Sequence, residues 1–253
     1  MADETCPSCN GTGWVIVERD GISGAEKCDC AARDRVRLVE NRAGIPPLYR
    51  RASFDDFLLP EDNDIAHRAL GMVMRMVRTY TREFPYGEKP GLLLIGETGT
   101  GKTHLAVAAL RILISRGFDG VFYDYLNLLG RIRASYDKAS GETDREAFRV
   151  AMETEILLLD DLGSQRLTEW TEDTLTSIVT YRCNHKKALI ATTNLPDPDA
   201  GATFLDRPTA MPGLIEHRET LAEKVGTRVR SRLFEMCKVV RMPQVEDYRL
   251  RRK

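Results

Sequence analysis

The stretch GLLLIGETGTGKTHLAVAALRILI, residues 91–114, decides the fold of this protein. Residues 91–95 form an apolar run with the length of a buried parallel strand, and the chain from Thr103 onward has the length and apolar content of a helix. Between them, GETGTGKT at residues 96–103 matches the phosphate-binding pattern G-x-x-x-x-G-K-[ST]. Such a loop points backbone N–H groups and the positive end of a helix dipole at phosphate. The stretch therefore predicts a nucleotide site on an α/β sheet.

Each residue type in this loop suits one part of a nucleotide. We expect Lys102 to reach the terminal phosphates and Thr103 to ligate Mg²⁺. A degenerate loop that binds no nucleotide is the alternative. The expected ATP-binding set is Gly96, Glu97, Thr98, Gly99, Thr100, Gly101, Lys102, Thr103 and His104.

Two acids end a second apolar run, EILLLDDLG at residues 155–163. The carboxyl ends of parallel strands face the crevice in which ligands bind. We therefore expect Asp160 to be the carboxylate on the Mg²⁺ side and Asp161 to be the base that polarises an attacking water. A solvated turn is the alternative for such a pair.

A third run, ALIATTNLP at residues 188–196, ends in a polar residue, Asn194. Asn194 could hold the attacking water or contact the terminal phosphate, although a polar residue before a proline is also typical of a plain turn. GVFYDY (120–125) and CKVVRM (237–242) complete five short strands with helical stretches between them. This alternation predicts a five-stranded parallel sheet with helices on both faces.

Four of the six cysteines lie in the first 30 residues, as CPSC and CDC. The segment between these pairs has the pattern of a short hairpin. Four thiolates brought together by a hairpin could hold zinc and so stabilise a segment that has no core of its own. A redox CxxC motif or unconnected buried cysteines are the alternatives. The expected zinc ligands are Cys6, Cys9, Cys28 and Cys30, whereas Cys183 and Cys237 have the apolar neighbours of core residues.

The composition limits the protein class. The chain has 253 residues, a formal net charge of −1 and 30% charged residues, with no run of about eighteen apolar residues that could span a bilayer. The start of the sequence has no secretion signal pattern, so we expect a cytoplasmic protein without a membrane partner. A basic stretch at residues 31–51, interrupted by GIPP, marks a boundary. We expect a zinc-binding domain with a basic linker over residues 1–44 and an ATPase domain over residues 45–253.

Four motifs in order carry a resemblance: GETGTGKTHLA, LLLDDLG, ATTNLP and GTRVRSRL. Together they resemble the AAA+ ATPases of the DnaC/DnaI helicase-loader and IstB-like group, over roughly residues 45–253. The cysteine-rich N-terminal segment resembles, more loosely, the zinc-binding domain of DnaI-type loaders. The resemblance implies an ATPase, weak alone and stimulated by DNA or assembly, that binds single-stranded DNA and loads the hexameric replicative helicase, with hydrolysis as a switch and the zinc domain as the docking element.

Two other functions stay open at this point. One is the role of a transposition ATPase within the same group. The other belongs to a different class, a P-loop phosphotransferase for a small molecule. A kinase must exclude water, whereas Asp160, Asp161 and Asn194 suit water activation, which favours the ATPase.

The resemblance also implies roles for arginines near the end of the chain. In the family, GER-like sequences before SRL supply an arginine finger to the ATP site of the adjacent subunit. Here GTR matches the arginine, Arg228, but not the acid, and self-association through the ATP site follows if Arg228 is the finger. Arg230 and Arg232 are expected to be salt-bridged or to face DNA. DYRLRRK resembles the second sensor region and makes Arg249 a candidate in its own ATP site, unless that tail is a disordered basic end.

The segment YLNLLGRIRASYDK, residues 125–138, is the candidate DNA contact. Leu126, Leu129 and Ile132 fall at helical spacing, so the segment is predicted to form an amphipathic helix. The remaining side chains include Arg131, Arg133 and Lys138, which could contact phosphates, and Tyr136, which could stack on a base. The family resemblance implies single-stranded DNA here, and a solvated helix is the alternative. The segment 196–218 is rich in proline and only 59 residues follow Asn194, so we expect the AAA+ lid to be reduced or absent.

Overall fold

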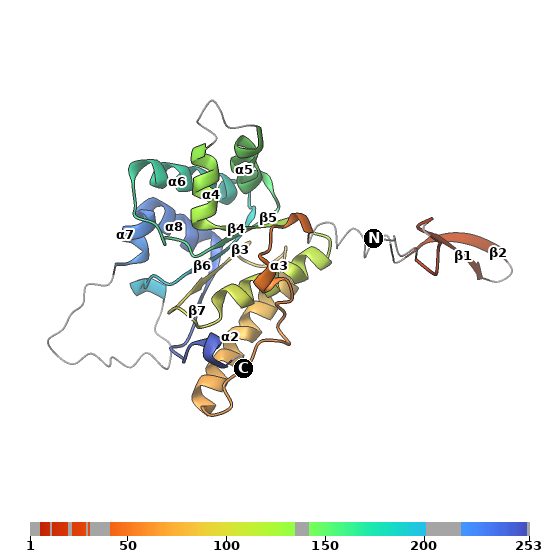
Figure 1. Cartoon of the computed structure of the whole chain (residues 1–253), viewed down its shortest axis with the longest axis horizontal. Helices are drawn as coiled ribbons and strands as arrows, with labels where there is room; N and C mark the ends of the chain where they lie inside the picture. The colour runs from red at the N-terminus through yellow and green to blue at the C-terminus, as the bar shows by residue number, and fades with distance from the viewer. Residues whose placement is uncertain are drawn as a thin grey trace.

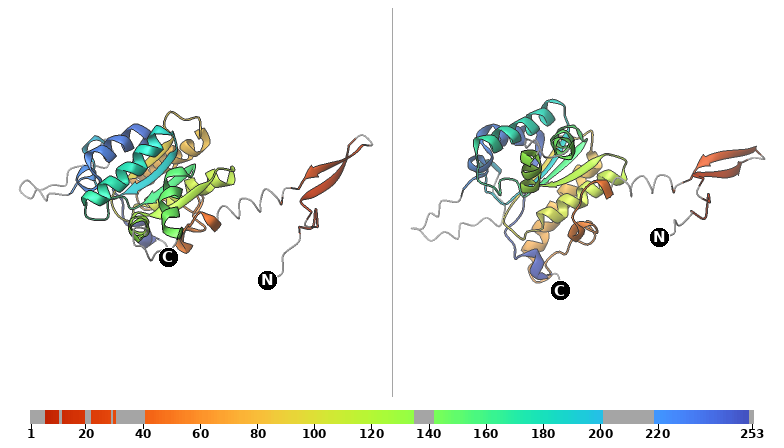
Figure 2. Two further views of the ribbon diagram at one scale, coloured as in Figure 1. Left: turned by 90° about the horizontal axis from the view of Figure 1, so that it is seen from above. Right: turned by 45° about the horizontal axis from the view of Figure 1, so that its top comes forward.

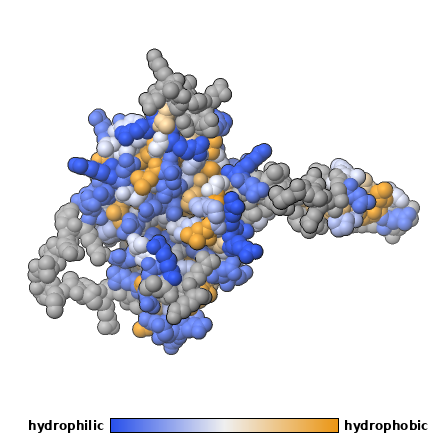
Figure 3. All heavy atoms as spheres, viewed as in Figure 1, coloured by the Kyte–Doolittle hydropathy of each residue, from blue (hydrophilic) through white to orange (hydrophobic). Residues whose placement is uncertain are grey.

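The computed structural model describes residues 6–10, 12–19, 22–28, 30, 41–134, 142–200 and 219–251. Near the N-terminus, β1 (Trp14–Arg19) pairs antiparallel with β2 (Ile22–Lys27), which confirms the predicted hairpin. Trp14 and Ile16 lie on its exposed face, and Figure 3 shows apolar atoms on the hairpin among hydrophilic ones. Residues 31–40 of the expected linker lie outside the described residues.

The larger described part of the chain is built around one parallel sheet. Its strands lie in the order β4-β5-β6-β3-β7, and every neighbouring pair is parallel. All five residues of β3 and all six of β6 are buried, as expected for strands covered on both faces. This confirms the predicted five-stranded sheet. The strands are β3 (Gly91–Ile95), β4 (Gly120–Asp124), β5 (Ile156–Asp160), β6 (Ala188–Thr193) and β7 (Cys237–Arg241).

Helices cover both faces of this sheet (Figures 1 and 2). On one face lie α2 (Asp64–Glu83) and α3 (Lys102–Ser115). On the other lie α4 (Tyr125–Ala134), α5 (Glu142–Glu153), α6 (Glu169–Asn184), α7 (Leu221–Val225) and α8 (Thr227–Met236). The remaining described helices are the 3₁₀ turns η1 (Pro47–Tyr49) and η2 (Pro198–Ala200), and α9 (Tyr248–Arg251).

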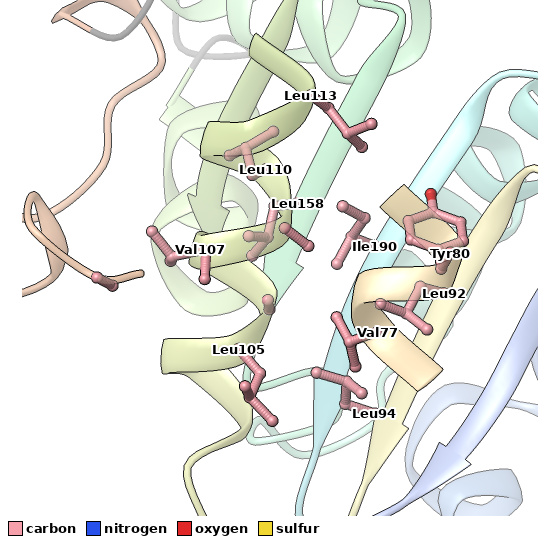
Figure 4. Close-up of a cluster of buried hydrophobic side chains, with 14 of the residues drawn as sticks. Val77, Tyr80, Leu92, Leu94, Leu105, Val107, Leu110, Leu113, Leu158 and Ile190 are labelled. Atoms are coloured by element: carbon pink, nitrogen blue, oxygen red, sulfur yellow. The ribbon is translucent and has the colours of Figure 1, made fainter. Parts of the chain in front are cut away.

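Alternate residues along the strands supply two cores. Leu92 and Leu94 pack with α2 and α3, whereas Leu93 and Ile95 pack with the helices on the opposite face. Figure 4 shows the first core, in which Val77 and Tyr80 of α2 and several leucines of α3 meet the strands. Ala43 and Ile45 also belong to this first core, so the chain packs against the sheet and its helices from residue 43.

Several element boundaries differ from the sequence predictions. The helix after the phosphate loop begins at Lys102 rather than Thr103, and β6 ends at Thr193 rather than Asn194. The predicted apolar face of the helix at residue 125 is confirmed at Leu129 and Ile132 but is wrong at Leu126, which is 48% exposed. Tyr125 and Leu128 are buried instead, because they lie on the side of α4 that packs into the second core. Tyr136 and Lys138 lie outside the described residues.

After β7, the described chain up to residue 251 contains α9 and no further helix. The reduced lid stays a prediction. The residues 201–218 of the proline-rich segment lie outside the described residues. Among the helices that are described, none combines the length and apolar character needed to cross a membrane.

Candidate nucleotide site

The phosphate loop continues directly from the buried strand β3. The amide of Gly96 donates to the carbonyl of Thr193 at 3.1 Å, which ties the start of the loop to the end of β6. Gly101 is the N-cap of α3, with φ of 92°, and a Cβ there would lie 2.5 Å from the Phe57 ring. Only glycine combines this backbone with this close approach. The loop therefore leads into the N-terminus of α3, where anions are favoured.

Lys102 is buried at the first position of α3. Its ammonium donates to the carbonyl oxygens of Gly96 at 2.8 Å and Glu97 at 2.7 Å. Burial lowers the pKa of Lys102 to about 8, against the opposing effect of Asp161, Asp160 and Glu97. Phosphate oxygens could take the place of these loop carbonyls, since they offer the cation a stronger partner.

Asp160 ends β5 and meets α3 through a hydroxyl. The hydroxyl of Thr103 donates to Asp160 Oδ1 at 2.9 Å, and the hydroxyl of Thr192 donates to the same oxygen at 2.6 Å. Burial raises the pKa of Asp160, and the bonds from Thr192 and Thr103 act against that rise. A hydroxyl and a carboxylate together are hard oxygen donors that suit Mg²⁺, so the residues present fit the predicted ion.

Asp161 adopts a left-handed backbone conformation, with φ of 57°. Its backbone N–H donates to Thr192 Oγ1 at 2.9 Å. Its side chain is exposed and lines the same cavity as Asp160. A non-glycine residue in this conformation is uncommon and is found at functional sites.

A cavity of about 510 Å³ gathers most of the predicted residues. It is large enough for a drug-sized ligand. Among the predicted residues, those that line it are Thr98, Gly99, Gly101, Lys102, Thr103, His104, Asp160, Asp161, Asn194 and Arg249. Gly96, Glu97 and Thr100 do not line the cavity. Their atoms instead hold the loop, since Thr100 Oγ1 donates to the carbonyl of Glu97 at 2.8 Å.

Five further lining residues were missed by the sequence analysis: Leu48, Tyr49, Asp124, Thr192 and Tyr248. Asp124 ends β4 at the same sheet edge as Asp160, so the strand-end argument could have found it. The amide of Tyr248 donates to the carbonyl of Gly99 at 2.6 Å, and its ring stacks on Phe57 with centroids 5.1 Å apart. The segment that carries Arg249 is thus folded onto the phosphate loop.

His104 has a structural contact in addition to its place in the cavity wall. Its Nε2 lies 2.7 Å from the carbonyl oxygen of Ser53, and the side chain is buried. His104 therefore joins α3 to the segment before α2. Its predicted nucleotide contact stays a prediction.

The candidate finger, Arg228, is separate from this cavity. It lies exposed on α8 and does not line the cavity of its own chain. Of the two alternatives for the neighbouring arginines, the structure shows ion pairs: Arg230 binds Asp197 at 2.7 Å and Arg232 binds Glu235 at 2.6 Å.

The four N-terminal cysteines form a second candidate site. Their sulfur atoms all lie within 4.8 Å of one another. Cys6 Sγ lies 3.7 Å from Cys28 Sγ, and Cys9 Sγ lies 3.4 Å from Cys30 Sγ. A tetrahedral zinc with Zn–S bonds of about 2.3 Å requires sulfur atoms about 3.8 Å apart, so the cluster fits zinc. Backbone N–H groups of Ser8 and Cys9 lower the pKa of Cys6 to about 6, whereas the neighbouring thiols raise the pKa of Cys30. The sulfur geometry, and not the pKa values, supports the zinc site.

The candidate DNA helix α4 presents its two arginines over aromatic rings. The guanidinium of Arg131 lies 5.7 Å from the centre of the Tyr123 ring, and that of Arg133 lies 4.8 Å from the centre of the Trp170 ring. Both arginines are exposed. Arginine and aromatic faces side by side can bind both the phosphates and the bases of a single strand.

The family described as IstB-like ATP binding protein matches residues 63–253. The chain belongs to this family. The match includes the phosphate loop, both acids of β5, Asn194 and α8, and the fold is that of a DnaC-type, IstB-like AAA+ ATPase.

Curated relatives of this IstB-like protein are moderately similar. It is 26% identical over 175 residues to the uncharacterized protein YqaM of Bacillus subtilis, a match that covers 66% of this chain and 54% of YqaM. It is 24% identical over 160 residues to the replicative helicase loader DnaC of Escherichia coli strain K12, covering 63% of this chain and 62% of DnaC. The chain thus spans about half to two thirds of the length of these relatives.

Solved structures give the same fold. A crystal structure of the DnaC helicase loader matches with a TM-score of 0.59 and 29% identity, over 78% of this chain and 99% of the loader chain. A crystal structure of DnaI matches with a TM-score of 0.56 and 21% identity, over 81% of this chain and 94% of that chain. At 21% identity, the match to DnaI supports the fold alone.

Proposed function

We propose that this IstB-like protein is an ATP-dependent DNA replication factor that loads the replicative helicase onto single-stranded DNA. The observation that carries the proposal is the match to the DnaC helicase loader, which covers 99% of that loader chain at 29% identity. The DnaC loaders among the curated relatives favour this role over transposition. The small-molecule phosphotransferase is disfavoured by the family, and by a cavity edge that carries Asp160, Asp161 and Asn194.

In this proposal, each group of residues that lines the cavity has one role in ATP binding or hydrolysis. Lys102 neutralises the terminal phosphates, and Thr103 and Asp160 hold Mg²⁺, whose charge would screen the phosphate oxygens. Asp161 polarises the attacking water, and Asn194 from the neighbouring strand orients it. Arg249, held against the phosphate loop by the contact of Tyr248 with Gly99, contacts the nucleotide in its own chain. The result is hydrolysis of ATP to ADP and phosphate.

Arg228 completes the site of a neighbouring protomer. Its exposure on α8 and its absence from its own cavity support a role between chains, because a finger must reach the charge that develops on the phosphoryl group. Self-association through the ATP site follows, and turnover should be weak until DNA or assembly brings protomers together.

Single-stranded DNA is proposed to lie along α4. Arg131 and Arg133 contact phosphates, and the aromatic partners Tyr123 and Trp170 offer stacking surfaces. Binding of several chains to one strand would align their ATP sites.

The N-terminal module is proposed to bind zinc and to dock the helicase. Residues 1–44 would comprise the zinc-binding part and a basic linker that ends where Ala43 packs into the ATPase core. Trp14 and Ile16, 51% and 80% exposed, are the apolar residues available on β1 for a protein partner. Thiolates that hold zinc need a reducing compartment, which supports a cytoplasmic location.

A pull-down with the replicative helicase of the same organism tests this proposal. The full chain should retain the helicase, and the amount retained should change between ATP and ADP. A Trp14→Ser/Ile16→Ser variant should retain less helicase while it binds ATP normally. Equal recovery of helicase on beads with and without the chain would refute the proposal that the helicase is a partner.

A further inference from the structure

Tyr248 joins three segments that are far apart in the sequence. Its backbone N–H donates to the carbonyl of Gly99 in the phosphate loop at 2.6 Å. Its hydroxyl donates to the carbonyl of Asp56 at 3.1 Å and accepts the backbone N–H of Leu58 at 3.3 Å. The backbone of this residue is thus bonded to the phosphate loop, and its hydroxyl is bonded to the segment that precedes α2.

The ring of Tyr248 belongs to a buried aromatic cluster at the phosphate loop. It stacks on Phe57 with 12° between the ring planes, and its centroid lies 5.6 Å from that of His104. All three residues are buried. The cluster is itself fixed, because Phe57 lies against Gly101 and His104 contacts the carbonyl of Ser53. Tyr248 therefore has a defined place relative to the loop.

Arg249 depends on these contacts for its own place. It belongs to α9, a helix of four residues, and a helix so short has little stability without tertiary contacts. The backbone N–H of Arg249 donates to Asp247 Oδ1 at 2.8 Å. Asp247 in turn lies so close to Gly99 that a Cβ added to the glycine would clash with its carboxylate. The two residues before Arg249 thus both contact the phosphate loop at Gly99.

Arg249 shares the nucleotide cavity with Lys102. Burial is the main cause that lowers the pKa of Lys102, and the charge of Arg249 adds to the lowering. Two cations in one cavity repel each other, and the phosphates of a nucleotide would relieve that repulsion. The benefit requires that Arg249 stays at the cavity when nucleotide arrives.

We propose that Tyr248 is a positioning residue for Arg249 in the nucleotide site. The bonds of its hydroxyl to Asp56 and Leu58 hold α9 where Arg249 reaches the phosphates of a nucleotide bound to the same chain. Tyr248 acts through Arg249, although its ring also lines the cavity. The inference rests on the proposed contact of Arg249 with nucleotide and adds the residue that sets this contact.

Tyr248→Phe removes the hydroxyl and keeps the ring, so stacking on Phe57 and the ring's place in the cavity wall are retained. Tyr80 provides a matched control. Its hydroxyl donates to the carbonyl of Pro90 at 2.8 Å, and the residue is buried in the first core without lining the nucleotide cavity. Tyr80→Phe therefore removes the same atom and a bond of the same kind at a place that does not touch Arg249.

The test is a double-mutant cycle on the full chain, with the affinity for a fluorescent, non-hydrolysable ATP analogue as the measured quantity. Arg249→Ala should weaken binding about ten- to hundredfold, the range for a lost hydrogen bond to a charged group. Tyr248→Phe should weaken it about three- to tenfold, the range for one ordinary hydrogen bond. In the Arg249→Ala background, Tyr248→Phe should cause no further loss. Tyr80→Phe should leave affinity unchanged in both backgrounds.

A second measurement follows α9 without any nucleotide. Backbone hydrogen exchange in the peptide that contains Tyr248 and Arg249 should be faster in Tyr248→Phe than in the wild type, because the contact with Gly99 opens more often. It should be unchanged in Tyr80→Phe. Faster exchange throughout the Tyr248→Phe chain would show damage to the whole fold and would overturn a role that acts through Arg249.

Wild-type affinity in Tyr248→Phe, together with weakened binding in Arg249→Ala, would overturn the inference while the contact of Arg249 with nucleotide stands. An equal loss from Tyr248→Phe with and without Arg249 would also overturn it, since Tyr248 would then act by another route. Wild-type affinity in Arg249→Ala would refute the proposed contact of Arg249 and the inference with it.

Discussion

Thr103 and Asp160, on α3 and β5, are joined by a hydrogen bond of 2.9 Å between hydroxyl and carboxylate. The contact brings together the end of the phosphate loop and the first acid of β5, which are 57 residues apart in the chain. A second hydroxyl, that of Thr192, donates to the same carboxylate oxygen from β6. Three elements thus converge on one oxygen at the carboxyl edge of the sheet.

Removal of the Thr192 hydroxyl should shift the pH dependence of turnover. Its hydrogen bond favours the charged form of Asp160, so Thr192→Val raises the pKa of that carboxyl further. Activity that needs the carboxylate should then be lost at a higher pH as the solution is acidified. We expect the acidic limb of the ATPase profile to move upward, with a stability cost of about 1–3 kcal/mol from the lost bond.

Thr174→Val is the control, since Thr174 Oγ1 donates to the carbonyl of Trp170 within α6. An unmoved acidic limb in Thr192→Val would contradict the assignment of Asp160.

Binding and turnover should separate at neighbouring residues. Lys102→Ala removes the buried ammonium and should abolish ATP binding or weaken it severely. Asp161→Asn should bind ATP normally and lose turnover, because the amide cannot act as the base. A fluorescent ATP analogue gives affinity, and phosphate release gives turnover. Wild-type turnover in Asp161→Asn would eliminate Asp161 as the base.

The cysteine cluster should hold one zinc per chain. Elemental analysis of the purified protein measures it directly. A Cys6→Ser/Cys9→Ser variant should lose the metal, whereas Cys183→Ser, on α6 and far along the sequence, should keep it. Absence of zinc from the wild type, or full retention in the double variant, would show that the cluster is not a zinc site.

DNA binding should depend on the arginines of α4. Arg131→Ala/Arg133→Ala should weaken binding to an oligothymidylate and reduce the slope of log affinity against log salt by about 1.4, the value for two phosphate contacts on a single strand. Arg149→Ala on α5 is the control, because Arg149 pairs with Glu146 and Glu153. An unchanged salt slope in the double variant would place the DNA elsewhere.

Short apolar runs and motifs in the sequence predicted most of the fold and part of the site. The apolar runs of β3, β5 and β6 and the glycine loop each specify their own conformation, so the five strands and the strand-end residues Asp160, Asp161 and Asn194 were predictable. Tyr49, Thr192 and Tyr248 were not predicted. Tyr49 lies in a segment without a motif, whereas Thr192 and Tyr248 lie within ATTNLP and DYRLRRK, and only the tertiary packing shows that these two residues also line the cavity. The error at Leu126 has a similar origin, since helical spacing fits more than one face and only the sheet selects the buried one.

The central claim, ATP-dependent loading of a helicase, is tested most directly on closed circular single-stranded DNA. A ring-shaped helicase cannot thread onto a strand without ends, so unwinding of an oligonucleotide annealed to the circle reports loading. With the full chain and ATP we predict unwinding that is absent without the chain and absent with Lys102→Ala. Equal unwinding with the wild type, with Lys102→Ala and without any added chain would contradict the account.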